Sequence, residues 1–99
     1  MLEIRHFQLI KAISEAGSMT HAASQLFLTQ PSLSHQLKEI ESRLGADLFL
    51  RVNKRMILTE EGKKIMEAAH EILSRVSLIE KEIKDHHRQV KKLRLTTQC

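Results

Sequence analysis

Apolar residues recur at helical spacing through the first 45 positions of this 99-residue chain. A first apolar stripe ends before Gly17, which is typical of a helix C-terminus. Ser18 predicts the N-cap of a short second helix, and Thr29 predicts the cap of a third, where Pro31 is tolerated in the first turn. The residues predicted to be buried are Phe7, Ile10, Ile13 and Ala16, then Ala22, Ala23 and Leu26, then Leu33, Leu37, Ile40 and Leu44, after which Gly45 ends the third helix.

The second and third helices are separated by only a few residues, and the small Ala22 and Ala23 allow close approach of another helix. This spacing predicts a helix-turn-helix from about residue 18 to residue 37. Two short β-like runs, 48–51 and 56–58, then flank the basic segment 52–55. They predict a two-stranded hairpin with a basic tip, the wing of a winged helix. The predicted fold class is therefore mainly α, with a winged helix-turn-helix over residues 1–59.

A long helix is predicted from Glu60 to Arg88, capped by Thr59 and carrying acidic residues in its first turn. Its apolar residues alternate at spacings of four and three, interrupted at His86, which is typical of a coiled-coil seam. Such a helix would be about 40 Å long, too long to pack wholly against a 58-residue domain, so we expect it to dimerise with its own copy. The predicted interface residues are Ile65, Ala69, Ile72, Val76, Ile79, Ile83 and Val90.

The charge distribution points to a polyanionic partner. The net charge is +4, and the positive charge is concentrated in residues 51–55 and 84–94. Nucleic acid would explain both clusters, although solvated surface charge is the alternative. Three Phe with no Trp or Tyr offer little surface for stacking unpaired bases, so a duplex is favoured over a single strand.

Other classes of protein are disfavoured by what the sequence lacks. The single Cys99 cannot form an intramolecular disulfide, and there is neither a signal peptide nor an apolar run long enough to span a membrane. The six His residues have no zinc-site spacing, and no phosphate-binding loop or nucleophile motif occurs. We therefore expect a cytoplasmic protein with no membrane association, no metal site and no enzymatic activity.

The third predicted helix carries a polar stripe opposite its apolar one. Pro31, Ser34, His35 and Lys38 recur at helical spacing, with Gln30 and Ser32 beside them at the N-terminal end. Short donors and acceptors near the N-terminus suit a recognition helix in the major groove, where Gln can bind adenine bidentately. The cations of the hairpin suit phosphate or minor-groove contact.

In these features the chain resembles the N-terminal DNA-binding region of LysR-type transcriptional regulators. The matching residues keep their order and spacing over about sixty positions: Phe7, Gly17-Ser18, Ala22-Ala23, Leu26, Gln30-Pro31-Ser32-Leu33-Ser34, Gln36-Leu37, Ile40-Glu41, Leu44-Gly45, Leu48-Phe49, Arg51, Leu58-Thr59 and Gly62. Two positions depart from the family pattern, since His35 stands where many members have Arg and Lys54 replaces a common wing Arg. The candidate DNA-binding residues are Ser18, Thr20, Thr29, Gln30, Pro31, Ser32, Ser34, His35, Lys38, Arg51, Lys54 and Arg55.

The resemblance also implies a domain organisation. Family members follow the winged helix with a dimerising linker helix and a C-terminal domain that binds a small-molecule co-inducer. Residues 60–88 correspond to the linker helix, and residues 89–99 to a hinge and the start of that domain, with 93–97 as its first strand. We therefore expect a fragment without a co-inducer pocket and without any other cofactor. The run 33–36 and the stretch 93–99 are similar to the methionine-biosynthesis regulators of the family, which respond to homocysteine.

Together these features predict sequence-specific binding of double-stranded promoter DNA at an inverted repeat, by a homodimer that becomes a homotetramer at full length. Two alternatives remain open at this stage. The chain could be a coiled-coil protein-interaction module, or a nonspecific architectural DNA binder.

Overall fold

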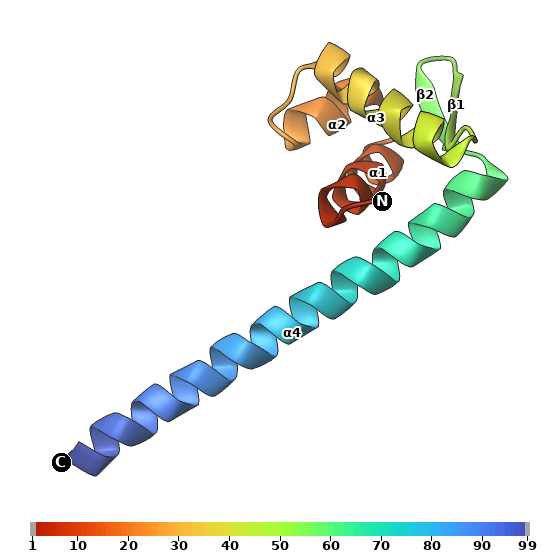
Figure 1. Ribbon diagram of the computed structural model, residues 1–99. Helices are drawn as coiled ribbons and strands as arrows, with labels where there is room; N and C mark the ends of the chain where they lie inside the picture. Colours follow the sequence, from red (N-terminus) through yellow and green to blue (C-terminus); the bar gives the residue numbers. More distant parts are fainter. Residues whose placement is uncertain (1, 99) are drawn as a thin grey trace.

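The computed structural model describes residues 2–98 of the chain, and the side chains of residues 2–87. Its elements, in order, are α1 (Ile4–Ala16), α2 (Met19–Gln25), α3 (Gln30–Leu44), β1 (Phe49–Val52), β2 (Arg55–Leu58) and α4 (Glu60–Gln98). The three short helices and the hairpin form a head, from which α4 extends as a single long rod (Figure 1). The molecule is accordingly elongated, measuring 64 × 24 × 20 Å. The predicted winged-helix architecture, followed by a long helix, is confirmed.

Local hydrogen bonds define the helix ends. Ser18 Oγ accepts from the backbone N–H of His21, and Thr29 Oγ1 accepts from that of Ser32, both at 3.2 Å. Gly17, with φ 72°, ends α1 in the left-handed conformation that favours glycine. The predicted caps are thus confirmed.

The core of the head is built from one apolar face of each short helix and the start of the hairpin. Its fully buried large residues are Ile10, Ile13, Leu33, Ile40 and Leu48. The small Ala22 and Ala23 are also buried, which lets α2 lie close to its neighbours. The prediction was wrong for Leu44, which is 41% exposed because it is the last residue of α3. His6 is buried instead, and its Nδ1 accepts from the Glu3 backbone N–H at 2.9 Å.

The hairpin is longer than predicted, because Val52 and Arg55 belong to the strands and pair with each other. Only Asn53 and Lys54 form the turn, with φ values of 50° and 66°. Positive φ at both central residues is the type I′ geometry, whose twist matches that of the flanking strands. The backbone N–H of Met56 also donates to the Gly17 carbonyl at 2.9 Å, which ties β2 to the α1–α2 junction.

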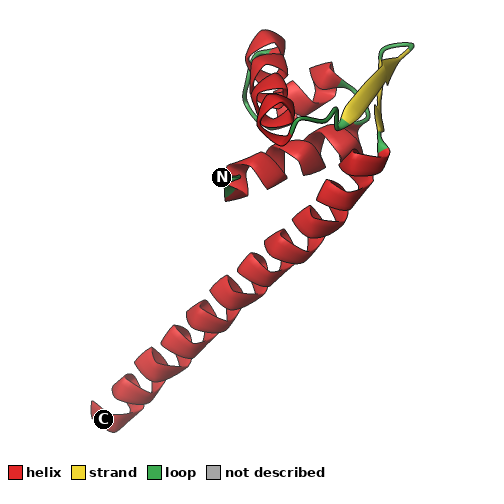
Figure 2. Ribbon diagram, turned by 45° about the vertical axis from the view of Figure 1, so that its right-hand side comes forward, coloured by secondary structure: helices red, strands yellow, loops and turns green. Residues whose placement is uncertain are grey.

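The first half of α4 packs against α1 (Figure 2). Met66 and Ala69 are buried there, and Ile72 and Val76 are half-buried. The assignment of Ala69 to a dimer interface was therefore wrong: its side chain has no exposed surface and belongs to the interior of its own chain. Farther along, the seam emerges into solvent, with Ile79 42% and Ile83 63% exposed. The side chain of Val90 lies outside the described ones.

The end of α4 differs from the prediction. The helix was expected to stop near Arg88 and to be followed by a strand at 93–97, but it continues to Gln98. A strand needs a neighbour for its backbone hydrogen bonds, and the only sheet within residues 2–98 is the two-stranded wing. The Lys, Arg and Leu residues of this segment are good helix formers, so the helix continues. No helix within the described range has the length and apolarity needed to cross a membrane.

Candidate nucleic-acid interface

The outer face of α3 presents the polar residues that the sequence places there. Leu33, Leu37 and Ile40 are buried against the head. On the other side Pro31, His35 and Lys38 are exposed, as is Gln30 at the N-terminal end, while Ser32 and Ser34 are half-buried. These predicted site residues thus share one solvent-facing surface, from which side chains can reach a partner without disturbing the core.

The N-terminal turns of α2 and α3 lie next to each other. Thr20 Oγ1 of α2 lies 3.4 Å from Gln30 Oε1 of α3, which brings a second helix to the Gln30 end of the exposed face. Ser18 caps α2, and its hydroxyl also lies 2.8 Å from Nδ1 of His21. Thr29 uses its hydroxyl to cap α3. Both helix N-termini carry the partial positive charge that attracts anions such as phosphate.

The wing cations do not form the single basic tip that the sequence predicted. In the hairpin, Arg51 pairs with Met56, and Arg55 pairs with Val52. Paired residues project from the same face of the hairpin, and successive residues in a strand project from opposite faces. The two arginines therefore project from opposite faces. Only Lys54 lies in the turn. All three side chains are exposed, and the wing can therefore offer a cation on each side of the hairpin.

A carboxylate that the sequence did not single out holds the wing against α3. Glu41 Oε2 accepts from the backbone N–H of Leu48 at 2.7 Å and from that of Phe49 at 3.4 Å. A charged acceptor makes these bonds stronger than neutral ones, so the start of β1 is fixed relative to the recognition face. The family pattern includes Glu41, but an acidic residue beside an apolar stripe is usually a surface charge, so the sequence gives no signal for this anchoring role.

Glu39 is the second residue of α3 that was missed. Its Oε1 lies 3.3 Å from His35 Nε2, one helical turn away, and both side chains are mostly exposed. The spacing i, i+4 is visible in the sequence and is the only signal that could have predicted this pair.

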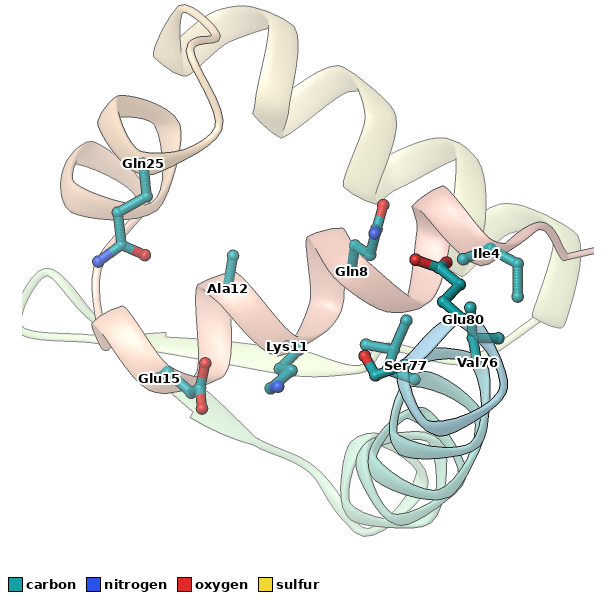
Figure 3. A pocket seen from close by; sticks show the side chains of 10 residues that line it. Ile4, Gln8, Lys11, Ala12, Glu15, Gln25, Val76, Ser77 and Glu80 are labelled. Carbon is teal, nitrogen blue, oxygen red and sulfur yellow. The ribbon is translucent and has the colours of Figure 1, made fainter. Parts of the chain in front are cut away.

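A separate cleft of about 440 Å³ opens where α4 diverges from α1. In Figure 3, Val76, Ser77 and Glu80 of α4 lie near the Ile4 end of α1, with Lys11 and Glu15 farther along α1. Its charged side chains are of both signs, which does not suit a polyanion. No cluster of three His, Cys, Asp or Glu side chains suited to a metal ion occurs among residues 2–87.

This arrangement defines a winged helix-turn-helix protein with a long helix after the wing. The chain belongs to the lysR family of bacterial regulatory helix-turn-helix proteins, whose family model matches residues 4–63.

Three comparisons illustrate the similarity. The HTH-type transcriptional regulator MetR of Haemophilus influenzae is 34% identical over 99 residues, covering 99% of this chain and 32% of that protein. The crystal structure of the BenM DBD/catB site 1 DNA complex has a TM-score of 0.78 at 34% identity, covering 84% of this chain and 93% of that one. The CbnR DBD–DNA complex has a TM-score of 0.75 at 30% identity, covering 84% of this chain and 95% of that one. The chain spans about one third of the length of the curated relatives that it matches first.

Proposed function

We propose that this chain binds double-stranded promoter DNA with sequence specificity, as the DNA-binding part of a bacterial transcriptional regulator. The observation that carries the proposal is the polar outer face of α3, with exposed Gln30 and His35 and half-buried Ser34 near its N-terminal end, together with the exposed cations of the wing. Short side chains at that end of a recognition helix reach base edges in the major groove. The similar solved structures that contain DNA, those of BenM and CbnR, support the same mode of binding.

Each part of the surface has its own role in this proposal. The α3 residues Gln30, Pro31, Ser34, His35 and Lys38 contact base edges and nearby phosphates. Ser18, Thr20, Thr29 and Ser32 position or contact the backbone at the two helix N-termini. Arg51, Lys54 and Arg55 contact phosphates and the flanking minor groove, one arginine on each face of the wing.

The proposal includes a homodimer that binds an inverted repeat. Leu78, Ile79 and Ile83 of α4 are exposed, and they would be covered by the same residues of a second copy. Two recognition helices related by a two-fold axis then contact half-sites separated by about one helical turn or a multiple of it.

The proposal extends to the full-length protein. The relatives are named transcriptional regulators, and regulators of this family generally bind a small-molecule co-inducer in an effector domain. We place the full-length protein in the cytoplasm, as a homotetramer at promoter DNA. The identity of its co-inducer stays open, and no residue of this chain is assigned to it.

The test is selection of binding sites from a randomised duplex pool with this chain at about 150 mM salt. We expect enrichment of a palindromic consensus. The Gln30→Ala variant should broaden the consensus at one position per half-site. Gln25 is an exposed glutamine on α2, and the Gln25→Ala variant should leave the consensus unchanged.

Two other outcomes would contradict the proposal. Duplex binding without a consensus would indicate an architectural DNA binder. A chain that is dimeric but retains no duplex would indicate a protein-interaction module.

A further inference from the structure

A histidine and a carboxylate form a pair on the outer face of the recognition helix. His35 Nε2 lies 3.3 Å from Glu39 Oε1, with the two side chains 74% and 59% exposed. When the imidazole carries its second proton, this contact is an ion pair. When the imidazole is neutral, the contact is a hydrogen bond from Nε2–H, and Glu39 keeps its net negative charge.

That negative charge matters at a DNA-binding surface. A duplex carries about one negative charge per 1.7 Å of its length, so an uncompensated carboxylate on the recognition face is repelled. A protonated His35 would compensate the negative charge of Glu39 across the 3.3 Å between Nε2 and Oε1. The net charge of the His35–Glu39 pair therefore depends on one proton.

Other charged and titratable groups lie near the pair. Lys38 and Arg43 line the same shallow surface hollow on α3. On α2, the titratable group is His21, which contacts Ser18 at the helix N-terminus. On α1, the charged Lys11 and Glu15 line the cleft beside α4 instead.

Building on the proposed function, we propose that His35 and Glu39 act as a proton-dependent readout pair, in which a protonated His35 bridges Glu39 and the DNA. The imidazolium has two donors, so Nε2–H can bind Glu39 while Nδ1–H donates to an acceptor in the major groove, either the guanine O6/N7 edge or a phosphate oxygen. The neutral ring that donates to Glu39 has only a lone pair at Nδ1 and cannot make this contact. In this proposal the complex holds more protons than the free protein, so affinity rises as the pH falls.

The experiment measures the dissociation constant of the chain for its selected duplex at pH 6 and pH 8 and at constant ionic strength. For uptake of up to one proton we expect binding about five- to tenfold tighter at pH 6. His35→Gln should remove this difference, because glutamine does not titrate. His70 is an exposed histidine on α4, and His70→Gln is the matched control, which should retain the difference in affinity between pH 6 and pH 8.

A second variant tests the carboxylate directly. Glu39→Gln removes the repulsion while keeping the size of the side chain, so binding at pH 8 should become about threefold tighter and the pH dependence should shrink to about twofold. Circular dichroism and thermal melting of each variant separate these effects from loss of folding.

The outcomes are distinct. If the pH dependence is confined to the selected duplex, the acceptor is a guanine edge; if a random-sequence duplex shows it equally, the acceptor is a phosphate. The pair is refuted if His35→Gln keeps the pH dependence, if His21→Gln removes it, or if Glu39→Gln leaves it unchanged. A chain that binds no duplex at either pH would instead refute the proposed function.

Discussion

Replacing Gly62 by alanine should destabilise the protein, although the same change usually stabilises a helix. Gly62 lies in the first turn of α4, where a Cβ atom would overlap the Leu48 carbonyl oxygen and stand 3.0 Å from its carbonyl carbon. Ordinary van der Waals contact needs at least 3.4 Å, and the obstacle is backbone rather than a side chain that can rotate. Either α4 or the start of β1 must therefore move.

The size of the effect follows from what that movement disturbs. The Leu48 carbonyl accepts from the Thr59 backbone N–H at 3.0 Å, and the Leu48 N–H donates to Glu41 at 2.7 Å. Overpacking costs about 1–3 kcal/mol, and weakening these two bonds adds about 1–3 kcal/mol. Against the gain of about 1 kcal/mol for Gly→Ala in a helix, the net destabilisation is about 3 kcal/mol, or about 15 °C in Tm for a domain of this size.

The assay is thermal and urea unfolding followed by circular dichroism at one fixed protein concentration, because dimerisation makes Tm concentration-dependent. Ser74→Ala, at an exposed position of α4, is the control for helix propensity and should be neutral or slightly stabilising. Gly17→Ala is the control for a positive φ without a clash, and should cost about 1 kcal/mol. A Gly62→Ala protein as stable as the wild type would refute the close approach of α4 to Leu48.

Further predictions concern the wing and the seam. Arg51→Ala should weaken binding to every duplex and lower the magnitude of the slope of log K against log salt by about one, whereas Arg75→Ala on α4 should leave the slope unchanged. If Arg51→Ala leaves the slope unaltered, Arg51 makes no phosphate contact. Glu41→Gln should cost about 1–2 kcal/mol in urea unfolding, since an amide oxygen replaces a charged acceptor, and unchanged stability would contradict its anchoring role. Ile83→Glu should weaken the dimer at least tenfold in sedimentation experiments while Lys81→Glu does not, and equal effects would place the seam elsewhere.

The sequence predicted best those features that depend on neighbouring residues. The caps at Ser18, Thr29 and Thr59 join atoms three positions apart, so residue type and position suffice to predict them. The exposed face of α3 followed from its apolar stripe by geometry alone. These local rules were enough to predict the helix-turn-helix and the exposure of Gln30, Pro31, His35 and Lys38 on α3.

Features that depend on distant residues could not be predicted in the same way. Glu41 and Gly62 owe their roles to Leu48, which only the tertiary structure brings beside them. The opposite placement of Arg51 and Arg55 depends on a two-residue turn, and a shift of one position in strand register would reverse the face of either side chain.

The heptad seam of α4 is the clearest case, because one apolar pattern has two partners. Periodicity states that a face is apolar but not which surface covers it. Here α1 covers the seam at Ala69 and partly at Val76, whereas Leu78, Ile79 and Ile83 are exposed among the side chains that the structure describes. In the proposed dimer this division has a geometric consequence. The head packs against the first turns of α4, and the second copy would bind farther along the same helix. The length of α4 between these two contacts would then set the distance between the two recognition helices. Half-site spacing is then determined by α4, and base preference by α3 and the wing.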